Sequence, residues 1–222
     1  MKVPRETTNR LIQLSRENKT SLTATLETLL AGVVFSHLPE STVDRVVSNG
    51  AISLRRFLPY DVVDDDKIGA WVTGYEFEHR RPKADPTEFS WSEARQVRQR
   101  IADELAKKRS DATSALLRWV SDIPKWFLEK EGTERGGTFE VSNLGVYKPG
   151  PAQSRDGGWN IGKMVFSQCG SVAGSGFSVS VVTGGDGCMT LAFSWLEGIV
   201  GGVWVENVID STRQRIDDLV SQ

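Results

Sequence analysis

The sequence contains two histidines, His37 and His79, the side-chain type most often used to exchange protons near neutral pH. His79 stands between Glu78 and Arg80 near the end of an expected strand, where it suits general acid–base chemistry if a pocket forms around it. The alternative is a solvated residue at a strand edge. His37 closes an apolar helical stripe, where a partly buried imidazole near the last carbonyls is common. We therefore take His79 as the candidate acid–base residue.

A second group of side chains is suited to donating hydrogen bonds to a carbonyl oxygen or an oxyanion. Ser142 and Asn143 lie at the end of an expected strand, and together with His79 they are the candidate catalytic residues. The candidate substrate-binding residues are polar or aromatic and are expected to line a channel: Trp71, Tyr75, Tyr147, Ser167, Gln168, Ser178, Ser180 and Trp195. The alternative is that Ser and Asn at a strand end make turn hydrogen bonds.

Other common active-site patterns are missing from the sequence. It has no G-x-S-x-G, so a serine nucleophile on a strand-to-helix turn finds no support. The glycines at 184–187 lie between two expected strands and not before a helix, which argues against a phosphate-binding loop. Cys169, Cys188 and the two histidines are too scattered for a zinc site, and residues 64–66 lack the spacing of a calcium loop. We expect no metal.

The composition excludes several classes of protein. The 222 residues include 27 basic and 29 acidic side chains, a balance that argues against nucleic-acid binding through bulk charge. No apolar run reaches the about 20 residues that span a bilayer, and the N-terminus has no apolar signal core. Two cysteines are too few for a disulfide framework. We expect a cytoplasmic protein with no membrane span.

Helices and two strands are expected to position the first half of these residues. Residues 8–17 and a longer stretch after residue 20 have helical spacing, and the longer one carries an apolar stripe: Leu22, Leu26, Leu29, Leu30, Val33 and His37. Strands are expected at 51–58 and 70–77, and a charged linker at 80–86. Ser90 and Glu93 form a capping box that opens a helix to about residue 108. Further helical stretches are expected at 112–120 and 123–128.

From residue 136 the sequence favours β-structure. Strands are expected at 139–142, 159–167, 176–183 and 188–195, with a tight hairpin turn at 183–187, because Gly and Asp accept the positive φ that such turns need. Alternation in the last two strands places large apolar side chains on one face and small polar ones on the other. An amphipathic helix ends the chain. The order of helices, strands, helices, strands and helix predicts one α+β domain over residues 1–222.

Six segments, in order along the chain, carry a family resemblance: NKTSLTATL (18–26), ISLRRF (52–57), IGA (68–70), FEVSNLG (139–145), FSQ (166–168) and GDGCMTLAFSW (185–195). Together they resemble the fungal alcohol acetyltransferase family. That family belongs to the chloramphenicol-acetyltransferase-like superfamily, with the plant BAHD acyltransferases and the condensation domains of peptide synthetases. The resemblance implies a two-layer α+β sandwich in which a mixed β-sheet packs against helices.

The resemblance covers the second half of a typical family member. Members usually have two similar halves, and the first carries an H-x-x-x-D motif whose histidine is the general base. Neither histidine here fits, because Ser41 follows His37 by four residues and Lys83 follows His79 by four. By position, Ser142 and Asn143 resemble a strand-end motif close to the reacting carbonyl. The resemblance also matches Gly69 to a channel-facing glycine, Arg56 to a structural arginine and residues 159–162 to a structural Gly/Trp signature.

Three functional hypotheses follow from this departure. The leading one is a truncated acyltransferase-like enzyme of fungal secondary metabolism that acts on a small-molecule intermediate by cyclisation, dehydration or isomerisation, none of which needs the missing base. The second is an acyl-CoA-dependent O-acyltransferase whose site is completed by a homo-oligomer or by a complementary half. The third is a non-catalytic binding half or a fragment. The residues themselves indicate no cofactor, and the resemblance implies acyl-CoA.

Overall fold

A computed structural model of the protein describes residues 1–41, 43–64, 67–83, 88–108, 113–148 and 160–222. Its strands form one mixed six-stranded sheet in the order β1-β6-β5-β4-β2-β3, in which β4 runs parallel to both of its neighbours. The strands are β1 Lys2–Val3, β2 Arg45–Ser53, β3 Val72–Arg80, β4 Phe139–Val146, β5 Phe177–Thr183 and β6 Met189–Trp195.

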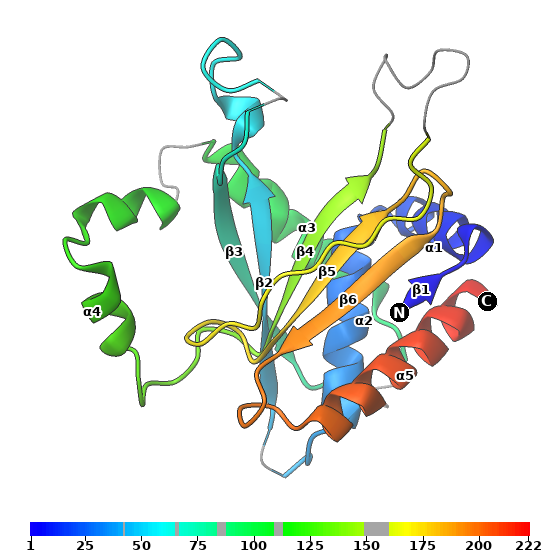
Figure 1. The fold of residues 1–222 in the computed structure, drawn as a ribbon. Coiled ribbons are helices and arrows are strands. Elements are labelled where there is room, and N and C mark those ends of the chain that lie inside the picture. The colour runs from blue at the N-terminus through cyan, green and yellow to red at the C-terminus, as the bar shows by residue number, and fades with distance from the viewer. Residues whose placement is uncertain (42, 65–66, 84–87, 109–112, 149–159) are drawn as a thin grey trace.

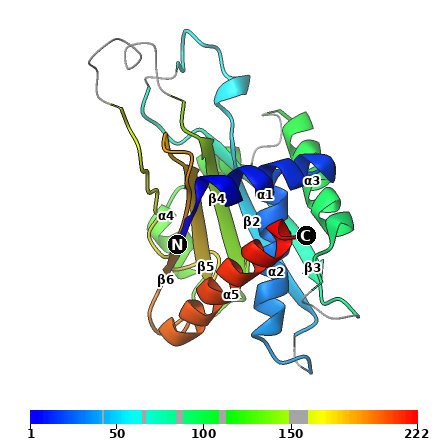
Figure 2. The same ribbon diagram turned by 90° about the vertical axis from the view of Figure 1, so that its right-hand side faces the viewer.

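One face of this sheet is covered by helices (Figures 1 and 2). The helices are α1 Arg5–Glu17, α2 Leu22–Ser36, α3 Trp91–Ala106, α4 Ile123–Leu128 and α5 Gly202–Val220, with 3₁₀ turns η1 Arg55–Phe57 and η2 Thr113–Trp119. In Figure 2, α1, α2, α3 and α5 lie in front of the sheet and α4 lies behind it. Among the described residues, no helix has the length and apolarity needed to cross a membrane.

Helix α2 is the centre of the helical layer. Its apolar stripe extends to nearly the whole helix surface, because α2 packs against the sheet on one side and against α1, α3 and α5 on the others. A helix that is apolar all round is typically buried in this way. The hydroxyl of Ser21 caps its start by accepting a hydrogen bond from the Ala24 N–H at 3.2 Å. The serine half of the capping box predicted for α3 is present, with the Glu93 N–H donating to Ser90 Oγ, while the Glu93 carboxyl is bonded to His79.

The sheet face opposite the helices carries the small polar side chains that alternation predicted. Core residues such as Val141 and Val179 point to the helices. Their neighbours on the other face, which we call the polar face, are Glu140, Ser142, Ser178 and Ser180, and β4 and β5 pair so that Ser142 lies opposite Ser180. The polar face is thus built from the two central strands of the sheet.

The strand predicted at 159–167 does not form within residues 160–167, and residue 159 lies outside the described residues. These residues instead cross the polar face as irregular chain, where the Met164 carbonyl accepts a hydrogen bond from Thr190 Oγ1 at 2.9 Å. One reason is that β5 is already paired on both edges by β4 and β6, and β1 pairs with Met189 and Thr190 at the start of β6. No free edge is left next to Thr190, where the segment crosses the sheet.

Other expected elements form with shifted bounds. The strand predicted at 51–58 begins at Arg45 and ends at Ser53, since it pairs with β3 over nine residues and then turns into η1. β3 likewise extends to Arg80, where a linker was expected, and residues 84–86 of that linker lie outside the described residues. The hairpin turn predicted at 183–187 is confirmed, with Gly187 at φ +77° and the Gly184 N–H donating to the Cys188 carbonyl at 3.1 Å.

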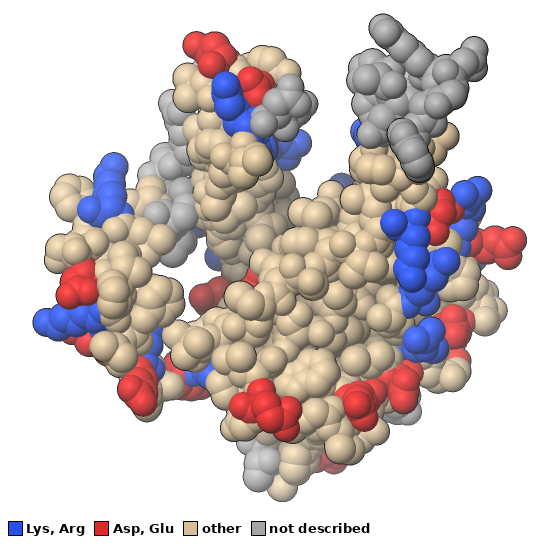
Figure 3. Space-filling view, viewed as in Figure 1, with Lys and Arg blue, Asp and Glu red and all other residues tan. Residues whose placement is uncertain are grey.

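Between β3 and β4 the chain forms an apolar arm, which we define as residues 113–131 and which contains η2 and α4. It lies on the side of the sheet opposite α1, α2 and α5, and Figure 3 shows it standing away from the rest of the surface. Six large apolar side chains of the arm are exposed: Leu116, Leu117, Trp119, Ile123, Phe127 and Leu128. The arm therefore contributes little to the core of this chain.

Candidate functional site

The structure separates the three candidate catalytic residues into two groups. Gly50 pairs with Val141 on one side and Tyr75 on the other, so Asn143 lies level with Ile52 and Thr73. His79 is six residues further along β3 than Thr73, a distance of roughly 20 Å at the usual rise per residue. Ser142 and Asn143 therefore lie at one end of the sheet, and His79 lies towards the other.

The side-chain amide of Asn143 is hydrogen-bonded within the protein at the end of β4. Its Oδ1 accepts a hydrogen bond from the Gly145 N–H at 2.8 Å, and its Nδ2 donates to Thr23 Oγ1 in the first turn of α2 at 3.1 Å. Gly145 has φ +81°, and the pairing of β4 with β5 shifts register between Asn143 and Val146. The amide thus stabilises a β-bulge and links the end of β4 to α2. This agrees with the alternative given in the sequence analysis, in which an Asn at a strand end makes turn hydrogen bonds.

Ser142 projects from the other face of β4 and is part of the polar face. It pairs with Ser180, whose Oγ donates to Gln168 Oε1 at 3.3 Å. The predicted binding residues Ser178, Ser180 and Gln168 are therefore brought together with Ser142, while Ser167 lies exposed in the segment that crosses them. Small hydroxyl and amide groups in this arrangement can hydrogen-bond a carbonyl oxygen.

Glu140 is a residue of the polar face that the sequence analysis did not select. It pairs with Ser178 on β5 and with Asn49 on β2. Burial raises the pKa of its carboxyl above the usual value. The available signal was its position two residues before Ser142, which puts both side chains on the same face of a strand.

Three of the four aromatic candidates lie in separate places outside the polar face. Tyr147 lines a hollow of about 390 Å³ beside the 183–187 hairpin, together with Ile161. Trp71 precedes β3, where the guanidinium of Arg55 lies 4.5 Å from the centre of its ring. Trp195 is on the helix-covered face and packs partly against the core, so it does not belong to the polar face.

His79 and Tyr75 belong to a buried hydrogen-bond network in the helical layer. Ser48 Oγ donates to Glu27 Oε2 at 2.8 Å, and the hydroxyl of Tyr75 donates to the other oxygen of the same carboxyl. His79 Nε2 lies 3.0 Å from Ser48 Oγ, and its Nδ1 lies 2.7 Å from Glu93 Oε1. Glu27, Ser48 and His79 are fully buried.

The contacts between Glu27, Ser48 and His79 fit two hydrogen-bond arrangements. In one, a neutral Glu27 carboxyl donates to Ser48, which donates to His79 Nε2. In the other, the Glu27 carboxylate accepts from Ser48, which accepts from His79 Nε2. Burial raises the pKa of Glu27 to about 7, against the lowering effect of its bonds from Tyr75 and Ser48. Burial also raises the pKa of Tyr75, which keeps its donating proton.

The network changes what His79 can do. Both ring nitrogens are bonded within the protein and the side chain has no exposed surface. A general base must reach the proton that it removes. His79 therefore does not present a free nitrogen to the polar face. Within the described part of the chain, no cluster of His, Cys, Asp and Glu is arranged to hold a metal.

Comparison with known proteins points to one family. A model of the alcohol acetyltransferase family matches residues 1–206. The probable alcohol acetyltransferase crmB of Aspergillus fumigatus is 33% identical over 202 residues, which are 86% of this chain and 43% of that protein. The probable alcohol acetyltransferase FCK4 of Fusarium pseudograminearum is 25% identical over 209 residues, 91% of this chain and 42% of that protein. The chain spans less than half the length of these relatives.

Solved structures show the same fold. The TRI3 trichothecene 15-O-acetyltransferase of Fusarium sporotrichioides matches 97% of this chain with a TM-score of 0.70 and 13% identity, and this match covers 45% of that protein. The epimerization domain from the third module of tyrocidine synthetase B matches 100% of this chain with a TM-score of 0.60 and 15% identity, over 47% of that structure. At such identities the likeness concerns the fold, and it confirms the predicted α+β arrangement of helices on a mixed sheet.

Proposed function

Because the chain belongs to the alcohol acetyltransferase family and has a chloramphenicol-acetyltransferase-like fold, we propose that it is one half of an acyl-CoA-dependent O-acyltransferase whose active site a second chain completes. This chain contributes the polar face as a wall of the substrate channel. The second chain, a complementary half or another copy, contributes the general base. We place this enzyme in fungal secondary metabolism, in keeping with the names of its relatives.

The apolar arm is the observation that supports completion by a second chain. Trp119 is 75% exposed, Leu128 68% and Phe127 51%, and the arm that carries them lies on the same side of the sheet as the polar face (Figures 1 and 2). Several large exposed apolar side chains on one short segment usually mark an interaction site. A partner that covers the arm would also lie next to the polar face, where the base is needed.

The chemistry proposed for the completed site is a simple transfer. The base takes the proton of the acceptor hydroxyl, and the oxygen attacks the thioester carbonyl carbon. The oxyanion then collapses, the bond to the CoA sulfur breaks, and the thiolate receives the proton. The hydroxyl of Ser142, on the polar face, is the donor from this chain best placed to stabilise the oxyanion.

Glu140 favours a second candidate function. A cyclisation, dehydration or isomerisation run by this chain alone needs an accessible acid–base group, and His79 is buried. Glu140 lies on the polar face with a raised pKa, a property that suits a carboxyl to proton transfer near neutral pH. Under this alternative, Glu140→Gln abolishes turnover by the isolated chain; under the leading proposal, the isolated chain has no turnover to lose.

The test of the leading proposal measures acetyl transfer from acetyl-CoA to a panel of alcohols. The chain is assayed alone and after mixing with the part of the Aspergillus fumigatus relative that it does not match, and the mass of each species is measured by analytical ultracentrifugation. We expect acetyl transfer only from the mixture or from a homo-oligomer of this chain. Ser142→Ala is expected to lower the rate at least about tenfold, which corresponds to 1.4 kcal/mol of activation free energy.

The arm provides the matched control. The double variant Trp119→Ser, Phe127→Ser is expected to prevent association and transfer, whereas Val203→Ser, which removes an exposed apolar side chain from α5, is expected to leave both intact. Transfer by a strict monomer of this chain at the rate of the mixture would overturn the proposal.

A further inference from the structure

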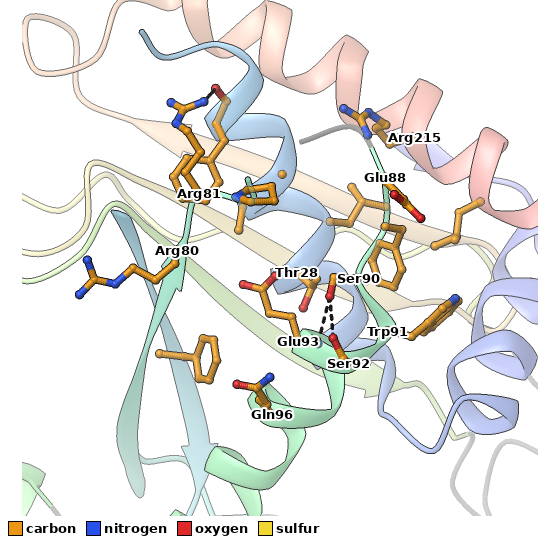
Figure 4. Close-up of a pocket in the computed structure, with 18 of the residues that line it drawn as sticks. Thr28, Arg80, Arg81, Glu88, Ser90, Trp91, Ser92, Glu93, Gln96 and Arg215 are labelled. Atoms are coloured by element: carbon orange, nitrogen blue, oxygen red, sulfur yellow. Dashed lines mark hydrogen bonds between the residues drawn. The ribbon is translucent and has the colours of Figure 1, made fainter. Parts of the chain in front are cut away.

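A pocket lies within the helical layer, on the side of the sheet opposite the polar face (Figure 4). It has a volume of about 880 Å³ and is bounded by α2, the end of β3, the start of α3 and the end of α5. Four aromatic side chains line it: Phe35, Phe77, Phe89 and Trp91. Its size is that of small-molecule sites, and charged and polar side chains line it beside the aromatic ones. None of the polar-face residues lines it, so it is separate from the acyl-transfer site proposed above.

Thr28 gives the pocket an unsatisfied polar group. The residue is 5% exposed, and its Oγ1 has no hydrogen-bond partner in the described part of the chain. A threonine within a helix usually satisfies its hydroxyl by bonding to a carbonyl one turn earlier. Since buried polar groups are nearly always bonded, a hydroxyl that faces a pocket without a partner points to a ligand. Figure 4 shows Thr28 beside Glu93 and Ser90 in the pocket.

Glu93 is held in place before any ligand binds. Its carboxyl is fixed by His79 Nδ1 at 2.7 Å, and its backbone N–H by the capping hydroxyl of Ser90. A carboxylate fixed in this way is suited to receive a cation at little cost in side-chain ordering.

The charges around the pocket favour a cationic ligand over an anionic one. The Arg81 guanidinium donates to the carbonyls of Phe35, Leu38 and Val43, and Arg80 is paired with Asp44 and Glu78. These two cations are therefore bonded within the protein, and Arg215, the third cation that lines the pocket, is not without a partner either. Of the two further carboxylates that line the pocket, Asp218 accepts a hydrogen bond from Gln214 Nε2 at 2.8 Å, and Glu88 forms no ion pair or hydrogen bond with the described residues.

From these observations we propose that the pocket binds a small organic amine with an apolar body. The ammonium group lies against Glu93 and donates to the Thr28 hydroxyl, and the apolar body packs on Phe77, Phe89 and Trp91, whose ring faces also attract cations. This site is independent of the acetyl-transfer proposal, because it uses other residues on the other side of the sheet.

The test compares two probes that share a phenyl ring and differ in charge, 2-phenylethylamine and phenylacetate. Binding is followed by titration calorimetry and by the fluorescence of Trp91, isolated as the difference between the protein and Trp91→Phe. We expect saturable binding of the amine, and a dissociation constant for phenylacetate at least about tenfold higher, since the carboxylates repel it.

Variants locate the amine. Thr28→Val keeps the shape of the side chain and removes its hydroxyl, and Glu93→Gln removes the charge; each is expected to raise the dissociation constant of 2-phenylethylamine by about tenfold, as for a lost charge-assisted bond. If Thr28→Val or Glu93→Gln unfolds, Glu88→Gln replaces it, because Glu88 is at an exposed position. Glu88→Gln is expected to raise the dissociation constant by a smaller factor than the other two variants. The control Glu206→Gln, an exposed carboxyl outside the pocket, is expected to change nothing. Equal binding of both probes, absence of saturable binding, or affinity unchanged in all pocket variants overturns the proposal.

Discussion

At the scale of single residues, the unusual feature is a carboxyl inside an apolar helix. Glu27 stands among the buried leucines of α2, and its two oxygens accept hydrogen bonds from Ser48 and Tyr75. The charged residue in an apolar stripe is readable from the sequence. Its partners are not, because they come from β2 and β3 and meet Glu27 only through the packing of α2 on the sheet.

The buried carboxyl predicts a pH dependence of stability. Glu27 has an ordinary pKa of 4.5 when unfolded and about 7 when folded. Between these values the folded chain holds a proton that the unfolded chain has lost, so the free energy of unfolding falls as the pH rises through this window and levels off above it. The loss amounts to roughly 3 kcal/mol.

Glu27→Gln tests this dependence. A Gln side chain can accept from Tyr75 and donate to Ser48, so the hydrogen bonds survive without a titrating group. We expect urea unfolding of the variant to show a flatter pH profile than the parent and a higher stability above about pH 7. Glu206→Gln, at an exposed position, is the control that should keep the parent profile. Parallel profiles for Glu27→Gln and the parent would mean that Glu27 does not carry the effect.

Gly50 makes room for the same network. A Cβ at this position would overlap the ring and hydroxyl of Tyr75, which packs directly on the backbone of β2. Gly50→Ala is therefore expected to displace Tyr75 from Glu27 and to lower the free energy of unfolding by about 1–3 kcal/mol, as for an overpacked core. Gly74→Ala is the matched control, because its nearest neighbour is a backbone oxygen at 3.5 Å, an ordinary contact. Equal losses in the two variants would contradict the steric explanation.

At the scale of elements, local patterns predicted the hairpin of β5 and β6 well and the segment at 159–167 badly. Alternation of apolar and polar residues is a property of one segment, and it survives in β5 and β6 because the two strands pair along their whole length. The residues at 160–167 pair with no strand. The early start of β2 was missed because Ser48, Asn49 and Gly50 are poor strand formers, which their pairing with β3 overrides.

The candidate site follows the same logic. Ser142, Ser178 and Ser180 share a face as their spacing predicts, because a two-residue repeat is local. The separation of His79 from Asn143 depends on strand order and register, which no segment encodes by itself. The pairing of His79 with Glu93 across β3 and α3 is likewise a consequence of tertiary packing.

The arm is an element whose apolar residues do not serve this chain's own core. Trp119 and Phe127 are more than half exposed, so the double variant Trp119→Ser, Phe127→Ser is expected to change the free energy of unfolding by less than about 1 kcal/mol. Phe139→Ala, at a fully buried position, is expected to lower the free energy of unfolding by about 3–5 kcal/mol. Urea unfolding measures both. An arm variant as unstable as Phe139→Ala would show that the arm belongs to the core after all.

At the scale of the whole molecule, the two sides of the sheet have different roles in our proposals. The helical side holds the core, the buried network and the amine pocket. The other side holds the polar face and the arm. The chain matches less than half the length of its relatives, and in our proposal a partner chain completes the second side.

This division predicts where a partner chain will protect the backbone. On binding the complementary half, hydrogen exchange should slow in the arm and in residues 160–170, which lie over the polar face, because both would be removed from solvent. Binding also stabilises the folded chain as a whole, so exchange that requires global unfolding slows everywhere by the same factor. Exchange in α2 and α5 should slow by that factor alone. The arm double variant, which should not bind, serves as the control. Protection concentrated in α5, with the arm unchanged, would place the partner on the helical side and would contradict an acyl-transfer site built on the polar face.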